Sequence, residues 1–369
     1  MAWVEPLHTI QEVNAAGKIL ALSQNSDNDW WDDDNNLENY LDAIIVINNW
    51  RGAHAYPLNT FQIYLRNTAR RFENGPLVAQ RIKRMASISN KLALQKSMKL
   101  SQMQDLGGCR AILSNVSNVK NVVKYYMETS QIKHVLASYD DYINFPKKSG
   151  YRGVHLVYRY HSDKNKKIYN NLKIEMQIRS RYQHAWATAV ETVSMFSGQA
   201  LKSSLGSEEW KRFFSLMGSA IALREGTALV PDTPTDRVEL IAELHEVATS
   251  LQVEHRLSEY NKALQSITSA TQDAFFYLMQ LDPESKTLTI QGFSEKEGAE
   301  ASVKYAEAEE AAKRKPGTDA VLVSVESVGS LAKAYPNYFA DTRLFVELLK
   351  QALAGRSRSI RVPDLKVKL

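Results

Sequence analysis

The stretch over residues 140–191 constrains the fold and the chemistry of this chain most. It joins a basic, glycine-containing loop to a predicted β-hairpin, and the hairpin runs directly into a predicted helix. The loop carries Lys147 and Arg152 together with two tyrosines, Tyr142 and Tyr151. Phosphate is bound by cations and backbone N–H groups, and a nucleobase by an aromatic face. The loop therefore predicts a site for an anionic ligand with a flat ring, such as a nucleotide.

The distribution of charge favours the same kind of ligand. The formal net charge is only +5, but residues 66–181 hold 23 Lys and Arg against 7 Asp and Glu. The segments on either side, residues 1–63 and 201–369, are net negative. A positive field attracts polyphosphate or nucleic acid. A solvated basic surface without a ligand is the alternative.

Size and composition narrow the class of protein. A chain of 369 residues is expected to form two or three domains. We find no apolar run long enough for a membrane span and no secretory signal, so we expect a cytoplasmic protein without membrane contact. The one cysteine, Cys109, excludes an internal disulfide framework and a cysteine-rich zinc site. We expect Cys109 to be a small buried strand residue, not a nucleophile.

Several cations precede the glycine pair in the sequence and are expected to converge in space. The run 77–82 reads as a strand, and Ser87 is expected to cap the helix that follows. Arg81 and Lys83 alternate on the strand and share a face, while Lys91 lies one helical turn after Ser87. These groups could bind a polyphosphate at a helix N-terminus, where the macrodipole also favours anions.

Two carboxylates stand among these cations. Asp105 precedes two glycines and a predicted strand over residues 109–113, which also carries Arg110. Glu175 lies in the hairpin. An acidic residue flanked by cations is a common arrangement for holding Mg²⁺ against a phosphate.

Histidines offer further candidates. Strand alternation places His155 on the face that carries charged groups, away from Leu156 and Tyr158, which favours a polar site. His184 starts a helix and is either catalytic or a structural hydrogen-bonding group; Glu191 follows it on nearly the same face. On an earlier helix, Arg66, Arg70 and Arg71 are either phosphate contacts or surface decoration.

The order of predicted elements indicates an α/β (α+β) fold with a mixed sheet, followed by a small α+β C-terminal domain. We expect helices over 10–23, 38–53, 57–72, 117–128, 181–199, 206–225, 234–272 and 295–314, and strands over 132–138, 274–281, 287–293 and 320–326. An acidic linker with Trp30 and Trp31 as packing anchors is expected near residues 27–34. The expected units are N-terminal helices (1–75), a core (76–200), a helical connector (201–273), a small domain (274–353) and a basic tail (354–369).

Four motifs occur in the order and spacing of one known family. They are RIKRMASISNKL, QMQDLGGCRAIL, DYINFPKKSGYRGVHLVY and EMQIRSRYQHAWATAVE, within residues 76–198. Together they resemble the RelA/SpoT synthetase domain, with a nucleotidyltransferase-like mixed sheet. Such domains transfer pyrophosphate from ATP to a ribose 3′-hydroxyl, and give ppGpp and pppGpp when GDP or GTP is the acceptor.

The resemblance implies a role for each matching residue. Asp105 and Glu175 would be catalytic and bind Mg²⁺, and Glu175 would also assist deprotonation of the 3′-hydroxyl. The ATP-binding residues would be Arg81, which would stack on adenine, and Lys83, Ser87, Lys91 and Arg110. The acceptor-binding residues would be Tyr151, which would stack on the base, and Lys147, His155, Gln177 and Arg179.

Departures from the family pattern are informative. Gly153 stands where many members have serine, which leaves local loop contacts in doubt. The chain has no His-Asp dipeptide, which the hydrolase domain of long family members would carry, so we expect it to make a product that it cannot itself degrade. The C-terminal region resembles, more weakly, the antitoxin-like part of fused toxin–antitoxin synthetases of the CapRel group. In that group a Tyr-x-x-Tyr motif blocks the ATP site, and AYPNYF supplies Tyr335 and Tyr338.

Three functions remain open on the sequence. The first is a toxin that pyrophosphorylates the 3′-CCA end of tRNA in phage defence, restrained by Tyr335 and Tyr338 and released by a phage protein. The second is a (p)ppGpp synthetase that uses GDP or GTP in stringent-response signalling. The third is a catalytically dead regulator that binds nucleotide or RNA; the presence of both Asp105 and Glu175 speaks against it.

Overall fold

We describe the fold from a computed structural model of the chain. The structure describes residues 3–24, 33–197, 207–263, 266–269, 274–282, 284–285, 287–313, 318–325, 328–336, 338–339, 341–356 and 360. Most of the expected acidic linker, with Trp30 and Trp31, and most of the basic tail lie outside these residues. Among the described residues, none of the helices is both long enough and apolar enough to span a membrane.

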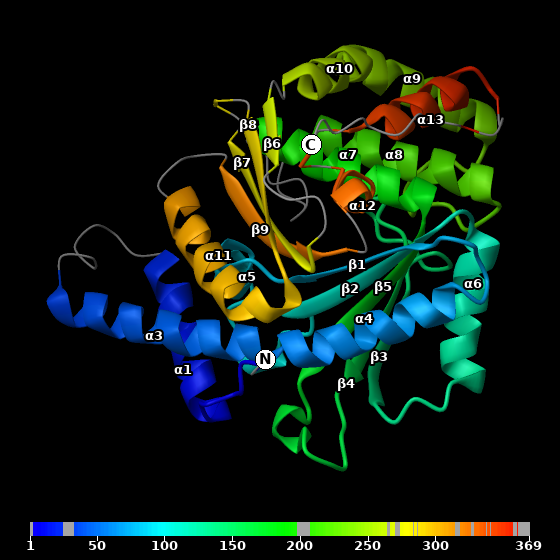
Figure 1. Ribbon diagram of the computed structural model, residues 1–369. Helices are drawn as coiled ribbons and strands as arrows, with labels where there is room; N and C mark the ends of the chain where they lie inside the picture. Colours follow the sequence, from blue (N-terminus) through cyan, green and yellow to red (C-terminus); the bar gives the residue numbers. More distant parts are fainter. Residues whose placement is uncertain are drawn as a thin grey trace.

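The described strands form one mixed β-sheet with helices on both faces (Figure 1). The strands are β1 (Leu77–Ile82), β2 (Gly107–Leu113), β3 (Val135–Asp141), β4 (Val154–Arg159), β5 (Lys173–Ser180), β6 (Ser266–Ser269), β7 (Phe276–Asp282), β8 (Thr287–Phe293) and β9 (Asp319–Ser324). Their order across the sheet is β3-β4-β5-β2-β1-β9-β7-β8-β6. Two pairs, β2 with β5 and β6 with β8, are parallel, and the others are antiparallel. The predicted mixed-sheet class is confirmed.

The helices are α1 (Ile10–Gln24), α3 (Asp34–Ala53), α4 (Ala55–Ala69), α5 (Met85–Leu94), α6 (Val116–Lys124), α7 (Arg181–Ser197), α8 (Glu208–Glu225), α9 (Arg237–Ser250), α10 (Val253–Ala263), α11 (Gly298–Lys313), α12 (Val328–Ala334) and α13 (Arg343–Leu353). Within the described ranges, the π-helical segment Tyr125–Thr129 extends α6, and short 3-10 segments occur at Leu100–Gln102, Lys167–Tyr169 and Glu295–Glu297.

Side-chain caps explain where several helices begin. Asn115, Ser207 and Asp236 each accept a backbone N–H in the first turn of α6, α8 and α9. These short polar side chains satisfy donors that a helix leaves free at its N-terminus. Gly226 ends α8 in the left-handed conformation that glycine adopts without strain.

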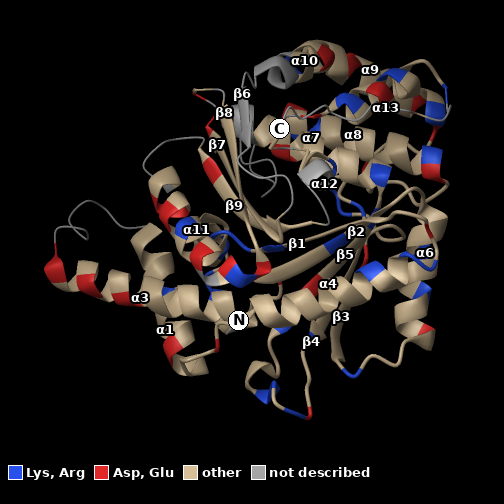
Figure 2. Cartoon of the chain, in the orientation of Figure 1, with Lys and Arg blue, Asp and Glu red and all other residues tan. Residues whose placement is uncertain are grey.

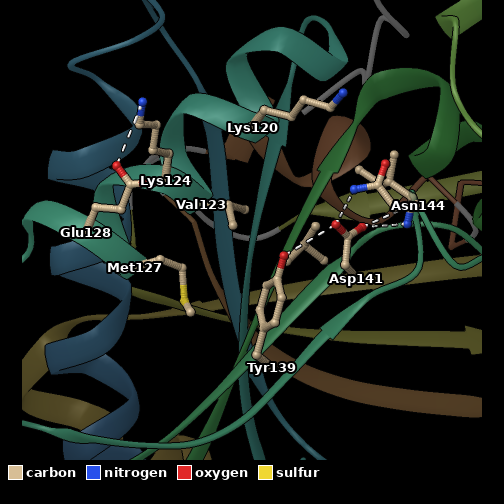
Figure 3. Close-up of a pocket in the computed structure, with 10 residues that line it drawn as sticks. Lys120, Val123, Lys124, Met127, Glu128, Tyr139, Asp141 and Asn144 are labelled. Carbon is tan, nitrogen blue, oxygen red and sulfur yellow. Dashed lines mark hydrogen bonds and ion pairs between the residues drawn. The ribbon is translucent and has the colours of Figure 1, made fainter.

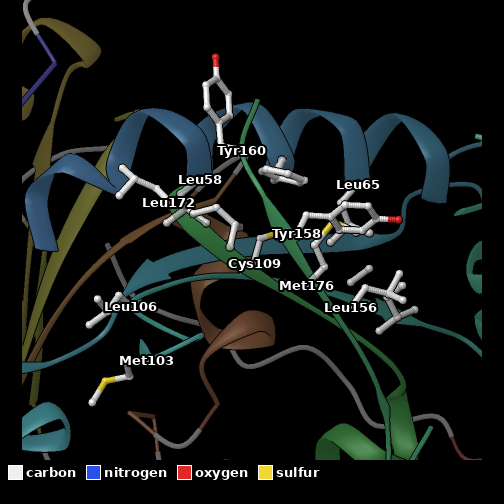
Figure 4. Close-up of a cluster of buried hydrophobic side chains, with 14 of the residues drawn as sticks. Leu58, Leu65, Met103, Leu106, Cys109, Leu156, Tyr158, Tyr160, Leu172 and Met176 are labelled. Atoms are coloured by element: carbon white, nitrogen blue, oxygen red, sulfur yellow. The ribbon is translucent and has the colours of Figure 1, made fainter. Parts of the chain in front are cut away.

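On one face of the sheet, α4 and α6 pack against the strands and form a hydrophobic core. Leu58 and Leu65 of α4 pack on Cys109, Leu156 and other strand residues (Figure 4). Alternate residues of each strand point into this core, because side chains of a strand alternate between the two faces. The neighbouring residues of β1, β2, β4 and β5 therefore point to the opposite face.

That opposite face is covered by α7 and by the C-terminal elements. A second core joins α7, α8, α9 and α13, and a third lies under β7, β8 and β9 and includes Tyr335 and Tyr338. The sheet is continuous between the two halves of the chain, because β1 pairs with β9 at Gln80↔Ser324 and Arg81↔Val323.

Two expected elements differ from the structure. Ser87 does not cap α5. The helix begins at Met85, directly after the extended residue Arg84, so Ser87 lies inside its first turn. The expected helix over 234–272 is broken into α9 and α10 and is followed by β6. Pairing of β6 with β8, a non-local contact, overrides the local helical preference.

Candidate active site

Strand register brings most of the predicted site residues onto one face of the sheet. Glu175 of β5 lies opposite Gly108 of β2, and Gly108 lies opposite Arg81 of β1. In the adjacent row, Gln177 lies between His155 of β4 and Arg110 of β2. Each of these residues alternates with a core residue and so faces away from α4 and α6. A Cβ atom at Gly108 would come no nearer than 3.9 Å to another chain segment, so the floor between Arg81 and Glu175 is open.

Asp105 is held by two lysines at the entrance to β2. Lys83 Nζ lies 2.6 Å from Oδ2 of Asp105, and Lys91 Nζ lies 3.0 Å from Oδ1. Burial would raise the pKa of Asp105, but the two ammonium groups lower it to about 2. Burial lowers the pKa of Lys83 in spite of its carboxylate partner. Asp105 is therefore ionised at neutral pH.

Glu175 belongs to a chain of polar contacts. His155 Nδ1 lies 2.9 Å from Oε1 of Glu175, and Gln177 Nε2 donates to Oε2 at 2.7 Å. On its other side, His155 Nε2 lies 2.6 Å from the hydroxyl of Tyr151. Although burial lowers it, the contacts with Tyr151 and Glu175 raise the pKa of His155 to about 9. Burial raises the pKa of Glu175, but His155 outweighs that effect and lowers it.

Two arginines place further positive charge on the same face. Arg110 and Arg179 are both buried. Burial, together with the neighbouring charge of Arg110, lowers the pKa of Arg179 to about 10. The Nε atom of Arg179 has no hydrogen-bond partner in the described structure. A buried cation without a full set of acceptors suits an anionic ligand.

Lys147 and Tyr151 meet within the loop between β3 and β4. Lys147 Nζ lies 4.2 Å from the ring centroid of Tyr142 and 5.6 Å from that of Tyr151. The Tyr151 ring meets Tyr142, His155 and Trp186 at steep angles. The predicted stacking face of Tyr151 is thus approached by the chain's own cation in this conformation.

The remaining candidate residues differ in where they lie relative to Glu175. Ser87 lies on α5 near Lys83, whereas Arg66, Arg70 and Arg71 belong to α4 or its end, on the far face of the sheet from Glu175. Burial keeps the Cys109 thiol protonated by raising its pKa.

His184 Nε2 lies 3.1 Å from the carbonyl oxygen of Lys333, and burial lowers the pKa of His184, so the ring is neutral and binds the backbone in this conformation. Burial would lower the pKa of Arg81, but the surrounding groups, with Glu191 the strongest of them, together raise it.

The C-terminal elements lie directly on this face. The hydroxyl of Tyr335 donates to the carbonyl oxygen of Gln80 at 3.0 Å, and the guanidinium of Arg110 lies 4.9 Å from its ring centroid. Tyr338 donates to Oδ2 of Asp319 at 2.8 Å. The same Asp319 oxygen forms an ion pair with Arg84, which follows Lys83.

A second contact reaches the start of α5 from α11, a helix that carries several acidic residues (Figure 2). Glu309 accepts the backbone N–H of Met85 at 2.8 Å and pairs with Arg51 of α3 at 2.7 Å. Tyr305 donates to the same carboxylate at 2.9 Å. Sequence reasoning missed these residues; only Arg84, inside the RIKRM run, carried a local signal.

A cavity of about 430 Å³ lies away from these groups, beside α6, the π-helical segment and β3 (Figure 3). Lys120, Met127 and Tyr139 contribute to its wall. Its lining includes core-facing Val154 and none of the predicted site residues. It therefore belongs to the opposite side of the sheet.

The site residues fall inside a segment that matches a known family. Residues 80–198 match the family model described as the region found in RelA / SpoT proteins. The chain contains a RelA/SpoT region. It holds every predicted catalytic, ATP-binding and acceptor-binding residue, whereas Tyr335, Tyr338 and α8 lie beyond it.

Individual relatives match parts of the chain. GTP pyrophosphokinase YwaC of Bacillus subtilis (strain 168) is 32% identical over 114 residues, which is 29% of this chain and 52% of the relative. The chain thus spans about half the length of this curated relative. Small alarmone synthetase 1 of Bacillus subtilis, in a crystal structure with its product pppGpp, has a TM-score of 0.41 and 21% identity, covering 47% of this chain and 90% of that chain. A GTP pyrophosphokinase family protein of Streptococcus pneumoniae has a TM-score of 0.37 and 23% identity, covering 54% and 90%.

Proposed function

We propose that this chain is a pyrophosphokinase that transfers pyrophosphate from ATP to a ribose 3′-hydroxyl. The observation that carries the proposal is the single sheet face on which ionised Asp105 and Glu175 stand among Lys83, Lys91 and buried arginines. Phosphoryl chemistry needs positioning and charge stabilisation more than a protein nucleophile. The RelA/SpoT region supports the same reaction.

The reaction divides the site into two halves. The 3′-oxygen attacks the β-phosphorus of ATP, the bond from that phosphorus to the α,β-bridging oxygen breaks, and AMP leaves with the electron pair. Arg81, Lys83, Ser87, Lys91 and Arg110 would hold ATP. Lys147, Tyr151, His155, Gln177 and Arg179 would hold the acceptor. Glu175 would accept the proton of the 3′-hydroxyl.

Asp105 and Glu175 also fit a magnesium ion. Both are ionised, and the charge of Asp105 acts on the pKa of Glu175, so the two carboxylates share one region. Mg²⁺ is commonly held by one or two carboxylates plus substrate phosphates. Bound there, it would neutralise charge on the transferred pyrophosphate. Each carboxylate oxygen already accepts one contact and retains a second lone pair.

The C-terminal unit restrains this activity in our proposal. Tyr335 lies under Arg110 and Tyr338 lies beside Arg84, on the ATP half of the site. The ring of Tyr335 would have to leave before ATP could contact Arg110, and Tyr338 binds Arg84, which directly follows Lys83 of the proposed ATP site. In the proposal a partner protein releases this restraint, and the CapRel resemblance suggests a phage protein as the candidate.

For the acceptor we propose the 3′-CCA end of tRNA, because a restraining unit fused to the synthetase is the arrangement of the toxin branch. The second candidate is GDP or GTP in the cytoplasm. It is favoured by the relative that bears the name GTP pyrophosphokinase.

The test offers ATP labelled at its β-phosphate to the full chain with GDP, GTP or bulk tRNA, with and without the Tyr338→Ala substitution. Label in tRNA supports the proposal that the acceptor is the 3′-CCA end of tRNA. Label in a guanine nucleotide supports the second candidate, in which GDP or GTP is the acceptor. Asp105→Asn and Glu175→Gln should each lower transfer at least about 100-fold, as loss of a group that stabilises the transition state does. The exposed Asp163→Asn substitution is the matched control and should change nothing. Absence of label in every acceptor, or full activity in the two site variants, would overturn the proposal.

A further inference from the structure

The loop between β3 and β4, which carries Lys147 and Tyr151, rests on helix α8. Gly150 has φ +93°, and a Cβ atom there would lie 2.5 Å from the carbonyl oxygen of Phe214 in α8. From the other side, a Cβ atom at Gly218 would lie 2.8 Å from Cα of Gly150. Two glycines thus let the loop and the helix backbone come into direct contact.

Gly218 stands in the interior of an 18-residue helix. A glycine there is less favourable than alanine by about 1 kcal/mol, so a packing reason is expected. The contact with Gly150 supplies that reason. Trp186 of α7 completes the arrangement, since its Nε1 donates to the same Phe214 carbonyl at 2.9 Å.

Arg152 ties the other end of the loop to the turn after α8. Arg152 is 2% exposed, and its guanidinium donates to the carbonyl oxygen of Ala228 at 2.6 Å, to the Thr227 hydroxyl, and to the carbonyl oxygen of Ile143 at 3.1 Å. Gly226, in the left-handed conformation, turns the chain so that these acceptors meet Arg152.

The same helix also supports the end of β5. Glu225, the last residue of α8, accepts from the Ser180 hydroxyl and from Gln183 Nε2 at 2.9 Å. Ser180 directly follows Arg179. Helix α8 therefore touches both segments that carry the proposed acceptor-binding residues.

We propose that α8 and the turn over residues 226–228 position the acceptor loop, with Gly218, Arg152 and Thr227 as positioning residues. The proposal rests on the proposed function, because it takes the loop's ligand to be the ribose-bearing acceptor. Helix α8 lies beyond the RelA/SpoT region, which ends at residue 198. The placement of Tyr151, and with it the fit of the acceptor's base, is set from outside the matched region.

The first test is amide hydrogen exchange on the full chain, which requires no activity. In Gly218→Ala the added methyl displaces Gly150, and exchange over residues 147–153 should quicken at least tenfold. Exchange over β1 and β2 should stay the same. Glu209→Ala, at an exposed position of the same helix, is the control. Unchanged exchange over the loop in Gly218→Ala would overturn the proposal.

The second test distinguishes an effect on acceptor binding from an effect on ATP binding. In the Tyr338→Ala background, with GDP, GTP and tRNA each offered with labelled ATP, Gly218→Ala and Thr227→Val should raise the KM of the labelled acceptor at least fivefold. The KM for ATP should change less than twofold, and Thr227→Ser should restore the acceptor KM because it keeps the hydroxyl. Thr227→Val carries this test if Gly218→Ala does not fold.

The outcomes distinguish the two proposals. Equal effects on both substrates, or none, would overturn the positioning role while leaving the proposed reaction intact. If no acceptor is labelled by any form of the chain, the proposed function fails, and the exchange result alone decides whether α8 holds the loop.

Discussion

At the scale of single residues, His155 shows how the sheet sets a protonation state. The hydroxyl of Tyr151 and the carboxylate of Glu175 lie at its two ring nitrogens, 2.6 and 2.9 Å away. The ring of Tyr142 faces it edge-on. Burial alone would favour the neutral ring, but the two polar partners raise the pKa of His155 to about 9. His155 is therefore positively charged at neutral pH and fixes the orientation of Glu175.

A pH dependence of stability follows. The folded state keeps the proton of His155 up to about pH 9, whereas an unfolded histidine with the ordinary value of 6.5 releases it earlier. The free energy of unfolding should therefore decrease as pH rises from 6.5 to 9, by up to about 3 kcal/mol from this group. Urea unfolding at the two pH values measures it. His155→Gln should flatten the difference, and the exposed His161→Gln should leave it intact; an equal slope in His155→Gln would contradict this role.

Much of this face could be predicted residue by residue. Strand alternation is a local rule, so it could place His155 on the polar face of its strand before any tertiary contact was known. Glu175, Gln177 and Arg179 are assigned to the site through the family resemblance. The sequence indicates that Asp105 is flanked by cations, but its pairing with Lys83 and Lys91, 22 and 14 residues away, is a finding of the structure. The partner of Arg84 could not be found this way, because Asp319 lies 235 residues away.

At the scale of elements, the start of α5 shows what local rules miss. Ser87 has the chemistry of a cap, yet Glu309 of α11 accepts the free N–H of Met85 instead. A carboxylate at a helix N-terminus is favoured by the macrodipole. Nothing in the sequence near residue 85 marks a residue of α11 as that partner. The contact ties α11 of the C-terminal unit to the helix that carries Ser87 and Lys91.

Glu309→Gln should loosen this contact. Arg51 is 4% exposed and Glu309 is 9% exposed, so the substitution leaves a buried guanidinium without its counter-charge. Removing one partner of a buried pair typically costs about 3–5 kcal/mol. Exchange of the Met85 amide should quicken at least about 100-fold, and ATP should bind more tightly. Glu307→Gln, at an exposed position of α11, is the matched control. Protection of Met85 equal to that of the parent would show that Glu309 is not what holds α11 to α5.

At the scale of the whole molecule, the continuous sheet is the main feature that the sequence did not reveal. A small C-terminal α+β unit could be expected from its turns and strand-like runs. Its attachment could not, because β1 and β9 pair over only two residue positions and lie more than 200 residues apart. Short backbone pairing carries no side-chain pattern that marks one partner for the other. As a result β1, the strand that carries Arg81, is paired through β9 with the C-terminal unit that covers the site.

The covering tyrosines give the last prediction. Tyr335 contacts the RelA/SpoT region through its ring under Arg110 and its hydroxyl on Gln80, while Tyr338 binds Arg84 and Asp319. Replacing a buried aromatic ring by alanine removes about 3–5 kcal/mol of packing. Tyr335→Ala and Tyr338→Ala should therefore each raise ATP affinity at least about tenfold, measured by calorimetry, which corresponds to only about 1.4 kcal/mol of the lost contact. Tyr335→Phe keeps the ring beneath Arg110 and should release the site far less. Because β1 stays paired with β9 in all three variants, the unit should remain attached, and only the two alanine variants lose a ring from the site. Affinity for ATP equal to that of the parent in both alanine variants would mean that the tyrosines pack against the site without closing it.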